Sequence, residues 1–332
     1  MSSTNRMMSD LLGQAESLVA VVRHQSGEGR AAMEAAATAL RAANRIVITG
    51  MGASLYAASL LHFHLRAMGL PSVAVDAGEL LHFGGSMAKG ATVVLVSRSG
   101  ETVEAVGLLP RLRDADATVI GVTNEAATTV ARESTITVLV NAGKDDAVAL
   151  QSYTGTAMVS LLLSALVAGD DRWDEAARAA AEVPSLLAAC EAGADRFRKL
   201  LTDARVIYLL GRGASLVTAH EGALLFNEAA KLPSVAMSAG AFRHGPVEVV
   251  DQGFRAFLIA SHVETASLDD ALRAYLKSLG GQVQTVAASG FFAPVLEVIP
   301  VQFAAYHASE MRGFTPGKFR YIAQVTTSET EF

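Results

Sequence analysis

A hexapeptide at positions 97–102, Ser-Arg-Ser-Gly-Glu-Thr, has the composition of an anion-binding turn. It follows the apolar run 93–96 and precedes a segment typical of a helix. The N-terminus of a helix has unpaired backbone N–H groups and the positive end of the helix dipole, which together attract phosphate. The hydroxyls of Ser97, Ser99 and Thr102 can donate further hydrogen bonds to such an anion. An ordinary helix N-cap is the alternative explanation of the same residues.

The charge of this turn favours a sugar monophosphate over a nucleoside triphosphate. Arg98 is its single cation, and neither a lysine nor a P-loop pattern is present in it. A second stretch, Gly-Met-Gly-Ala-Ser at 50–54, lacks the third glycine of a dinucleotide fingerprint, because position 55 is leucine. Gly52 still allows the backbone to approach a ligand closely, and Ser54 adds a fourth hydroxyl for the phosphate.

Two residues further along the chain are candidates for proton transfer. A predicted helix at 220–231 carries Glu221 and Glu228 seven positions apart, and therefore on one face. A carboxyl among its Ala, Leu and Phe side chains is expected to have a raised pKa, which suits proton transfer near neutral pH. His244, in the loop that follows, can move a proton to open a sugar ring. A solvated glutamate and a structural histidine are the alternatives.

The sequence predicts neither a metal site nor a cofactor. His62 and His64 lie two positions apart on a predicted helix, so their side chains point in different directions. No other group of His, Cys or carboxylate residues has the spacing of a ligand set.

The composition is that of a globular protein without nucleic-acid or membrane partners. The 332 residues are 51% hydrophobic and 18% charged, which allows a large core. The net charge of -6 disfavours nucleic acid and anionic membranes. The single Cys190 cannot form an internal disulfide. The longest apolar run, 157–169, predicts a buried helix too short to cross a bilayer. These features predict a cytoplasmic protein.

An internal duplication organises the chain, at a spacing of about 162 residues. Leu-Pro-Ser-Val-Ala at 70–74 returns at 232–236, and Gly-Xaa-Gly-Ala-Ser at 50–54 returns at 211–215. In each copy, short apolar runs alternate with helical segments, which predicts a doubly wound parallel sheet covered by helices. Such sheets bind ligands at the carboxyl ends of their strands, where both the glycine turn and the serine turn fall.

The expected strands of the first copy are 45–49, 72–76, 92–97, 118–123 and 136–140. Those of the second copy are 205–210, 234–238, 256–260, 282–287 and 297–300. The predicted domains are N-terminal helices at 1–44, a phosphate-binding repeat at 45–170, linker helices at 171–203 and a second repeat at 204–332.

The two copies differ at the serine turn. The second copy keeps Ser261 and Thr265 but has His262 where the first has Ser99, and it lacks the counterpart of Gly100. We therefore expect the first copy to hold the phosphate and the second to supply other groups.

Taken together, these residues resemble the sugar isomerase (SIS) domain family, including the isomerase half of glucosamine-6-phosphate synthase and the stand-alone amino-sugar-phosphate deaminases. The resemblance rests on the segments 97–102, 221–224 and 244–246 and extends from about residue 45 to residue 329. It implies two tandem SIS-type, flavodoxin-like repeats with flanking helices, an enzyme of the phosphosugar isomerase or deaminase type, and a homodimer.

The resemblance also implies roles for individual residues. The substrate phosphate would be bound by Ser54, Ser97, Ser99 and Thr102. Glu228 would move a proton between C1 and C2, and His244 would assist ring opening across the dimer interface. The other expected substrate contacts are Gly52, Arg98, Gly100 and Gln324.

Two departures from the family pattern affect the expected chemistry. Gln324 stands where the synthase has a lysine that forms a Schiff base, and an amide cannot form an imine. A family lysine after the first repeat is also absent, with Gln151 in that segment. The expected function is isomerisation of an amino-sugar 6-phosphate with deamination. The alternatives are a fructosamine-6-phosphate deglycase, a ketose/aldose-phosphate isomerase and a non-catalytic sugar-phosphate sensor.

Overall fold

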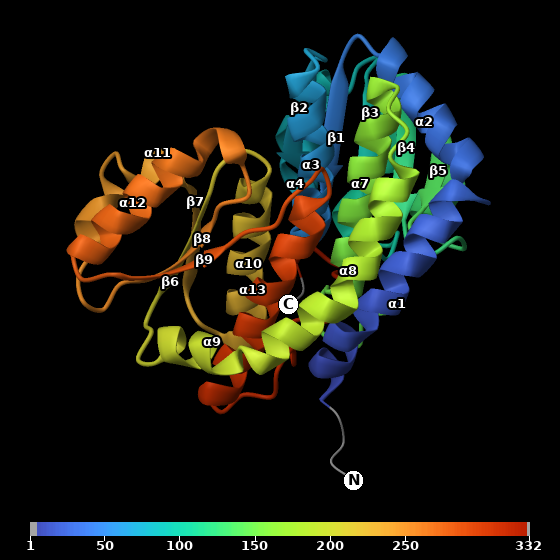
Figure 1. Ribbon diagram of the computed structural model, residues 1–332. Helices are drawn as coiled ribbons and strands as arrows, with labels where there is room; N and C mark the ends of the chain where they lie inside the picture. Colours follow the sequence, from blue (N-terminus) through green and yellow to red (C-terminus); the bar gives the residue numbers. More distant parts are fainter. Residues whose placement is uncertain (1–4, 331–332) are drawn as a thin grey trace. The chain divides into compact units, whose positions relative to one another are not determined.

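The computed structural model describes residues 5–330 and divides into two compact units, each with its own parallel sheet (Figure 1). The first-sheet unit comprises Gln14–Lys144, Gln151–Ala181 and Arg320–Phe332. The second-sheet unit comprises Met1–Gly13, Asp145–Leu150 and Glu182–Phe319. Two of the five boundaries between the units fall inside long helices, α1 (Arg6–Ser26) and α8 (Trp173–Ala192).

The first sheet has five parallel strands in the order β2-β1-β3-β4-β5, which is the doubly wound arrangement expected from the sequence. The strands are β1 (Ile46–Gly50), β2 (Ser72–Asp76), β3 (Thr92–Val96), β4 (Thr118–Thr123) and β5 (Ile136–Leu139). All five predicted strands of the first copy are confirmed to within one residue at each end. β1 and β3 are buried along their whole length, as expected for strands covered on both faces.

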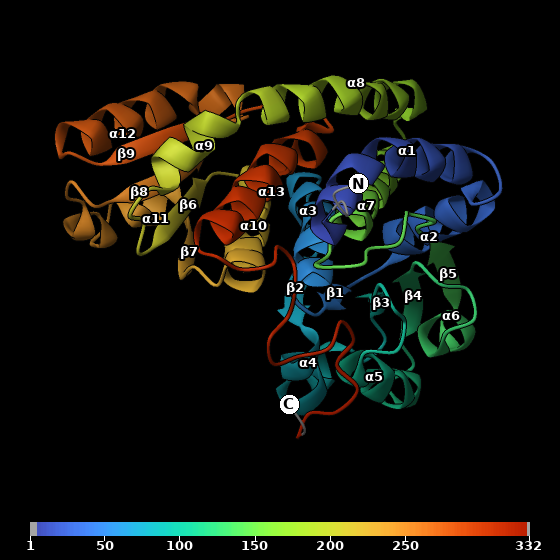
Figure 2. The same ribbon diagram turned by 90° about the horizontal axis from the view of Figure 1, so that it is seen from below.

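Helices flank this sheet in the order that the alternating pattern predicts (Figures 1 and 2). They are α2 (Arg30–Ala42), α3 (Ala53–Ala67), α4 (Ala77–Phe83), the 3-10 turn η1 (Gly85–Met87), α5 (Val103–Asp114), α6 (Thr129–Glu133) and α7 (Gln151–Ala168). Helices α1 and α2 lie before the first strand, where the sequence predicts N-terminal helices.

The apolar helix α7 lies in the interior of the protein. Within the described chain it is the one helix that is long and apolar enough to span a bilayer, and 89% of it is buried inside the protein. The predicted burial is confirmed, but the predicted length was wrong. The helix begins at Gln151, before the apolar run, and the run missed its first turns because they bury polar Gln, Ser and Thr residues.

The second sheet has four parallel strands in the order β7-β6-β8-β9, which repeats the order of the first four strands of the first sheet. They are β6 (Ile207–Gly211), β7 (Ser234–Ser238), β8 (Arg255–Ile259) and β9 (Gln282–Val286). The flanking elements are α9 (Ala194–Leu201), α10 (Ser215–Ala230), α11 (Ala239–Phe242), η2 (Pro246–Val249), η3 (Val263–Thr265), α12 (Ala266–Ser278) and α13 (Ala293–Met311).

The predicted fifth strand of the second copy, 297–300, is wrong. These residues lie in α13, which is buried at every position from Ala293 to Ser309. A helix that is apolar on all sides has no 3.6-residue pattern, so a short stretch of it resembles a buried strand.

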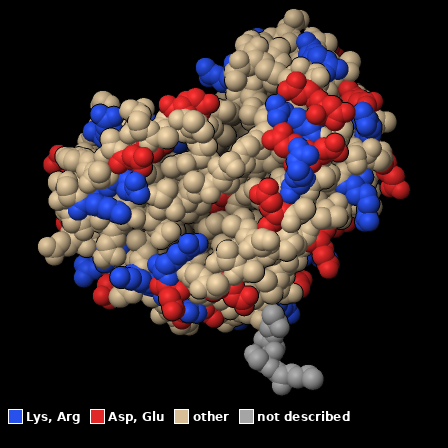
Figure 3. Space-filling view, in the orientation of Figure 1, with Lys and Arg blue, Asp and Glu red and all other residues tan. Residues whose placement is uncertain are grey.

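The surface carries charges of both signs. On the face shown in Figure 3, Lys and Arg side chains alternate with Asp and Glu side chains. The mixture of signs on this face agrees with the slightly acidic composition.

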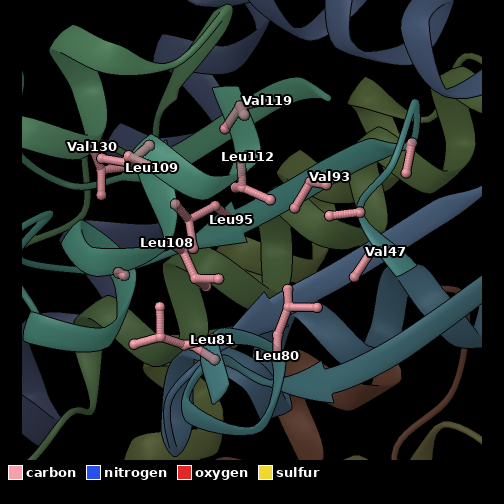
Figure 4. Close-up of a cluster of buried hydrophobic side chains, with 14 residues drawn as sticks. Val47, Leu80, Leu81, Val93, Leu95, Leu108, Leu109, Leu112, Val119 and Val130 are labelled. Atoms are coloured by element: carbon pink, nitrogen blue, oxygen red, sulfur yellow. The ribbon is translucent and has the colours of Figure 1, made fainter. Parts of the chain in front are cut away.

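A cluster of aliphatic side chains fixes α4 and α5 against the first sheet (Figure 4). Val93 and Leu95 of β3 are fully buried and belong to the same cluster as Leu80 of α4 and Leu108 and Leu112 of α5. Burying a Leu or Val side chain contributes roughly 1.5–3 kcal/mol. This packing holds the N-terminus of α5, and the serine turn before it, at the carboxyl edge of the sheet.

Candidate functional site

The glycine turn and the serine turn leave the first sheet side by side. Gly50, the last residue of β1, is paired in register with Val96, the last residue of β3. A Cβ atom on Gly50 would lie 2.6 Å from the carbonyl oxygen of Val96, so the close approach of these strand ends requires glycine. The two turns predicted to share a ligand are therefore neighbours at the carboxyl edge of the sheet.

The serine turn is organised by its own hydroxyls. Ser97 is only 2% exposed; its Oγ accepts the N–H of Gly100 at 3.1 Å and lies 3.1 Å from Oγ1 of Thr102. The Oγ of Ser99 accepts the N–H of Glu101 at 3.2 Å, while the side chain stays partly exposed. Ser97 thus shapes the turn from within, whereas Ser99 and Thr102 stay partly exposed.

Two neighbouring residues stabilise this shape. Gly100 has φ +64°, and a side chain there would overlap Thr128. The carboxylate of Glu101 accepts hydrogen bonds from the backbone N–H of Thr129 at 2.7 Å and from its hydroxyl at 2.9 Å. The turn is therefore held from both sides, which reduces the entropy lost when a ligand binds.

The N-terminus of α5 opens directly from the serine turn. Thr102 is its N-cap residue, and the threonine side chain makes no capping hydrogen bond. The N–H of Val103, the first helical residue, instead donates to the carbonyl oxygen of Thr326 at 3.0 Å. A segment far away in sequence thus supplies the acceptor at the start of the candidate phosphate-binding helix.

The C-terminal segment makes two further contacts on the same unit (Figure 2). The guanidinium of Arg98 donates to the carbonyl oxygen of Gln324 at 3.1 Å. His82 Nε2 lies 2.8 Å from a carboxylate oxygen of Glu329. Arg98 and Gln324, both expected as substrate contacts, are therefore neighbours. The sequence reasoning missed Thr326 and Glu329, because a tail without periodicity gives no signal of where it packs.

Two further residues of the glycine turn, Gly52 and Ser54, lie at the start of α3. Gly52 has φ +50° and precedes α3, and Ser54 is the second residue of that helix and is partly buried. Ser54 therefore lies at a second helix N-terminus at the same sheet edge.

The predicted proton-transfer residues belong to the second-sheet unit. Glu228 is partly buried on α10, and His244 is exposed in the turn after α11. The residues predicted to bind phosphate, Ser54, Ser97, Ser99 and Thr102, all belong to the first-sheet unit. The structure thus places these residues at one sheet edge and the two residues predicted to transfer protons on the other repeat.

Glu221 lies on the same helix as Glu228, one heptad earlier. It is fully buried, and neither of its carboxylate oxygens has a hydrogen-bond partner. Burial, followed by the negative charges of Glu228 and Asp145, raises the pKa of Glu221 well above 4.5. The raised pKa expected for a carboxyl on this helix is thus found at Glu221.

The histidine pair 62 and 64 lies on α3. His62 Nδ1 lies 3.0 Å from the hydroxyl of Ser72, and burial lowers the pKa of His62. Within residues 5–330, no group of three or more His, Cys, Asp or Glu side chains is arranged to hold a metal ion.

Known proteins share the sequence pattern of this chain. A family model described as SIS domain matches residues 39–168 and 200–290. The glutamine–fructose-6-phosphate aminotransferase of Pyrobaculum aerophilum is 30% identical over 348 residues, covering 97% of this chain and 57% of the relative. That of Sulfurisphaera tokodaii is 29% identical over 303 residues, covering 87% and 51%. The chain thus spans about half the length of these relatives.

Solved structures share the fold at lower sequence identity. Glucosamine-6-phosphate deaminase from Thermotoga maritima superimposes with a TM-score of 0.82 at 20% identity, covering 97% of this chain and 99% of the other. The C-terminal domain of glucosamine-fructose-6-phosphate aminotransferase from Francisella tularensis has a TM-score of 0.80 at 20% identity, covering 94% and 97%. Since the family model matches more than half of its length, the chain belongs to the SIS domain family.

Proposed function

We propose that this protein is an enzyme that binds an amino-sugar 6-phosphate and releases its amino group as ammonia. The observation that carries the proposal is the hydroxyl turn 97–102, which lies at the carboxyl edge of a parallel sheet and opens α5. Glucosamine 6-phosphate is the substrate that we propose to test first, since the Thermotoga maritima structure with this fold is a glucosamine-6-phosphate deaminase.

The proposed phosphate site needs no metal ion. Ser54, Ser99 and Thr102 offer partly exposed hydroxyls, the buried Ser97 shapes the turn that presents two of them, and the starts of α3 and α5 add backbone N–H groups. Each hydrogen bond to a charged group contributes roughly 1.5–3 kcal/mol net. Several such bonds anchor the ester and leave the sugar ring free to react.

The proposed reaction begins with ring opening, in which His244 moves a proton to the ring oxygen. Glu228 then takes the proton from C2 of the open aldose and delivers it to C1, while O1 gains a proton and the amino nitrogen loses one, which leaves a hydroxyl at C1 and an imine at C2. Water adds to C2, and the resulting carbinolamine collapses to a ketose 6-phosphate and ammonia. One water molecule is consumed for each ammonia released.

Gln324 is compatible with this chemistry. A Schiff-base lysine is required when the enzyme itself must supply the nitrogen that activates a ketose. An amino sugar carries its own nitrogen at C2, so deamination proceeds through an imine of the substrate. The same reasoning covers a deglycase acting on a fructosamine 6-phosphate.

We also propose a homodimer in which the partner completes the site. His244 is exposed, as a residue that serves a neighbouring subunit must be in the isolated chain. The phosphate cluster of one subunit would then be used together with the second repeat of its partner.

The test is an assay of ammonia release from glucosamine 6-phosphate by the wild-type protein and by Glu228→Gln. We expect the wild type to form equal amounts of ammonia and ketose phosphate and the variant to form neither. No ammonia from the wild type would contradict deamination of this substrate. A panel that follows free amine and ketose separately distinguishes the alternatives: a deglycase releases amine from fructosamine 6-phosphate, and a plain isomerase releases none.

A non-catalytic sugar-phosphate sensor is the second candidate, favoured by the amide at position 324. It predicts saturable binding of sugar phosphates without turnover of any member of the panel. Measurable turnover would exclude it.

A further inference from the structure

A buried carboxylate joins three segments of the second-sheet unit. Glu297 of α13 is 1% exposed and accepts hydrogen bonds from three hydroxyls. The hydroxyls of Ser215 and Thr218, in the first turn of α10, donate at 3.1 and 2.6 Å, and that of Ser261, after β8, donates as well. The Oγ of Ser261 also accepts the N–H of Ala288 at 3.0 Å, so its own proton is directed to Glu297.

The position of this carboxylate corresponds to the phosphate site of the first repeat. Ser215 is the counterpart of Ser54, and the N–H of each bonds to the carbonyl three residues earlier at 3.1 Å. The preceding glycines have nearly the same φ angle, +50° at Gly52 and +54° at Gly213. The segment of Ser261 follows β8 as the serine turn follows β3. The two repeats therefore present hydroxyls from the same two loops at the same edge of their sheets.

Neighbouring donors in the second repeat are also satisfied by side chains of the same unit. The N–H of Ala214, at the start of α10, donates to His262 Nε2 at 3.1 Å. The hydroxyl of Thr265 donates to Asp269 at 3.0 Å, and Arg212 Nε pairs with the same carboxylate at 2.8 Å. Two internal carboxylates thus take the hydrogen bonds that an external anion would otherwise receive.

We infer that the second repeat retains an oxyanion-binding site, that Glu297 of the same chain occupies it, and that a free small carboxylate occupies it when the side chain of Glu297 is removed. The bound carboxylate fixes the first turn of α10, which is the helix that carries Glu221 and Glu228. In the second repeat, the site thus binds a side chain of the same chain, and this contact holds α10 in place. The inference does not depend on the proposed reaction.

The experiment uses acetate as the probe. Glu297→Ala keeps Cβ and removes a CH2–COO⁻ group, which has the same heavy atoms as acetate. We expect the variant to have a lower Tm than the wild type, and acetate to raise that Tm in a saturable manner. Acetamide has the same shape but no charge and is expected to have a much weaker effect. Sodium chloride at equal ionic strength serves as the salt reference.

Two matched variants separate site binding from general effects of acetate. Glu297→Gln fills the site with an amide, and Val298→Ala makes an apolar cavity on the same helix, so neither is expected to respond beyond the wild type. Equal responses of all four proteins would overturn the inference. If Glu297→Ala does not fold, it is refolded with and without acetate. Recovery only with acetate supports the inference, and no recovery in either overturns it.

Discussion

The backbone N–H of Val103 donates a 3.0 Å hydrogen bond to the carbonyl oxygen of Thr326. The C-terminal segment therefore occupies the first donor of α5, beside the hydroxyls of the serine turn. Arg98, within that turn, binds the carbonyl of Gln324 on the same segment. The hydrogen bonds donated by Val103 and Arg98 therefore hold position 324 close to the proposed phosphate site.

Because of this proximity, an amine introduced at position 324 should reach a bound ketose. We predict that Gln324→Lys forms an imine with fructose 6-phosphate, with loss of water, and that borohydride traps it as a stable adduct seen by mass spectrometry. The wild type and Gln324→Arg should give no adduct, because neither presents a primary amine. Equal labelling of the wild type would point to another lysine, and Lys318→Arg would identify it.

The two serines of the turn should differ in their effect on stability. Ser97→Ala removes the hydroxyl that lies beside Thr102 Oγ1 and accepts the N–H of Gly100, although that N–H keeps the carbonyl oxygen of Ser97 as acceptor, so the variant should lose about 1 kcal/mol. Ser99 is partly exposed, so Ser99→Ala should cost about 0.5 kcal/mol or less. Urea unfolding of both variants measures the difference. Equal losses of stability would contradict the division of the turn into an inner and an outer hydroxyl.

The buried Glu221 should make stability depend on pH. Its pKa is raised in the folded state by burial and then by Glu228 and Asp145, so folding favours the neutral form. Its contribution to stability is complete below the ordinary glutamate pKa of about 4.5 and is lost as pH rises through the raised value. We therefore predict that wild-type stability falls relative to Glu221→Gln as pH increases above that point.

Urea unfolding of the wild type and Glu221→Gln between mildly acidic and mildly basic pH measures this slope. The exposed Glu182→Gln is the control and should follow the wild type. Parallel curves for the wild type and Glu221→Gln would show that this carboxyl does not titrate abnormally.

The proposed shared site predicts complementation between two inactive variants. Ser99→Ala damages the proposed phosphate site, and His244→Asn removes the proposed ring-opening group. If the partner supplies His244, random mixing after dissociation should restore about a quarter of the wild-type activity, because half of the dimers are mixed and each has one intact site. A mixture with no more activity than its separate components would contradict the shared site.

The local pattern of the sequence was sufficient to predict the first sheet. Strands such as Thr92–Val96 are apolar, short and followed by turn residues, so composition and length define them together. The duplication then predicted a second parallel sheet of the same kind. The false strand at 297–300 arose because α13 is buried on all sides, and no polar face there reveals a helix.

The part of the candidate site that is formed by residues close in sequence could be predicted. Ser97, Ser99 and Thr102 lie within one turn, so sequence spacing alone brings them together. The contacts of Thr326 with Val103 and of Glu297 with Ser261 depend on tertiary packing between distant segments. Charge and spacing in the sequence carry no information on such pairs.

The central claim is that the first repeat binds a phosphate ester while the second supplies the proton-transfer groups. Calorimetric titration of Glu228→Gln, with and without Ser99→Ala, separates binding from turnover. We predict that Glu228→Gln binds glucosamine 6-phosphate saturably and binds glucosamine far more weakly, and that adding Ser99→Ala weakens ester binding about tenfold or more. Equal affinity for the ester and the free sugar, or no effect of Ser99→Ala, would contradict the account.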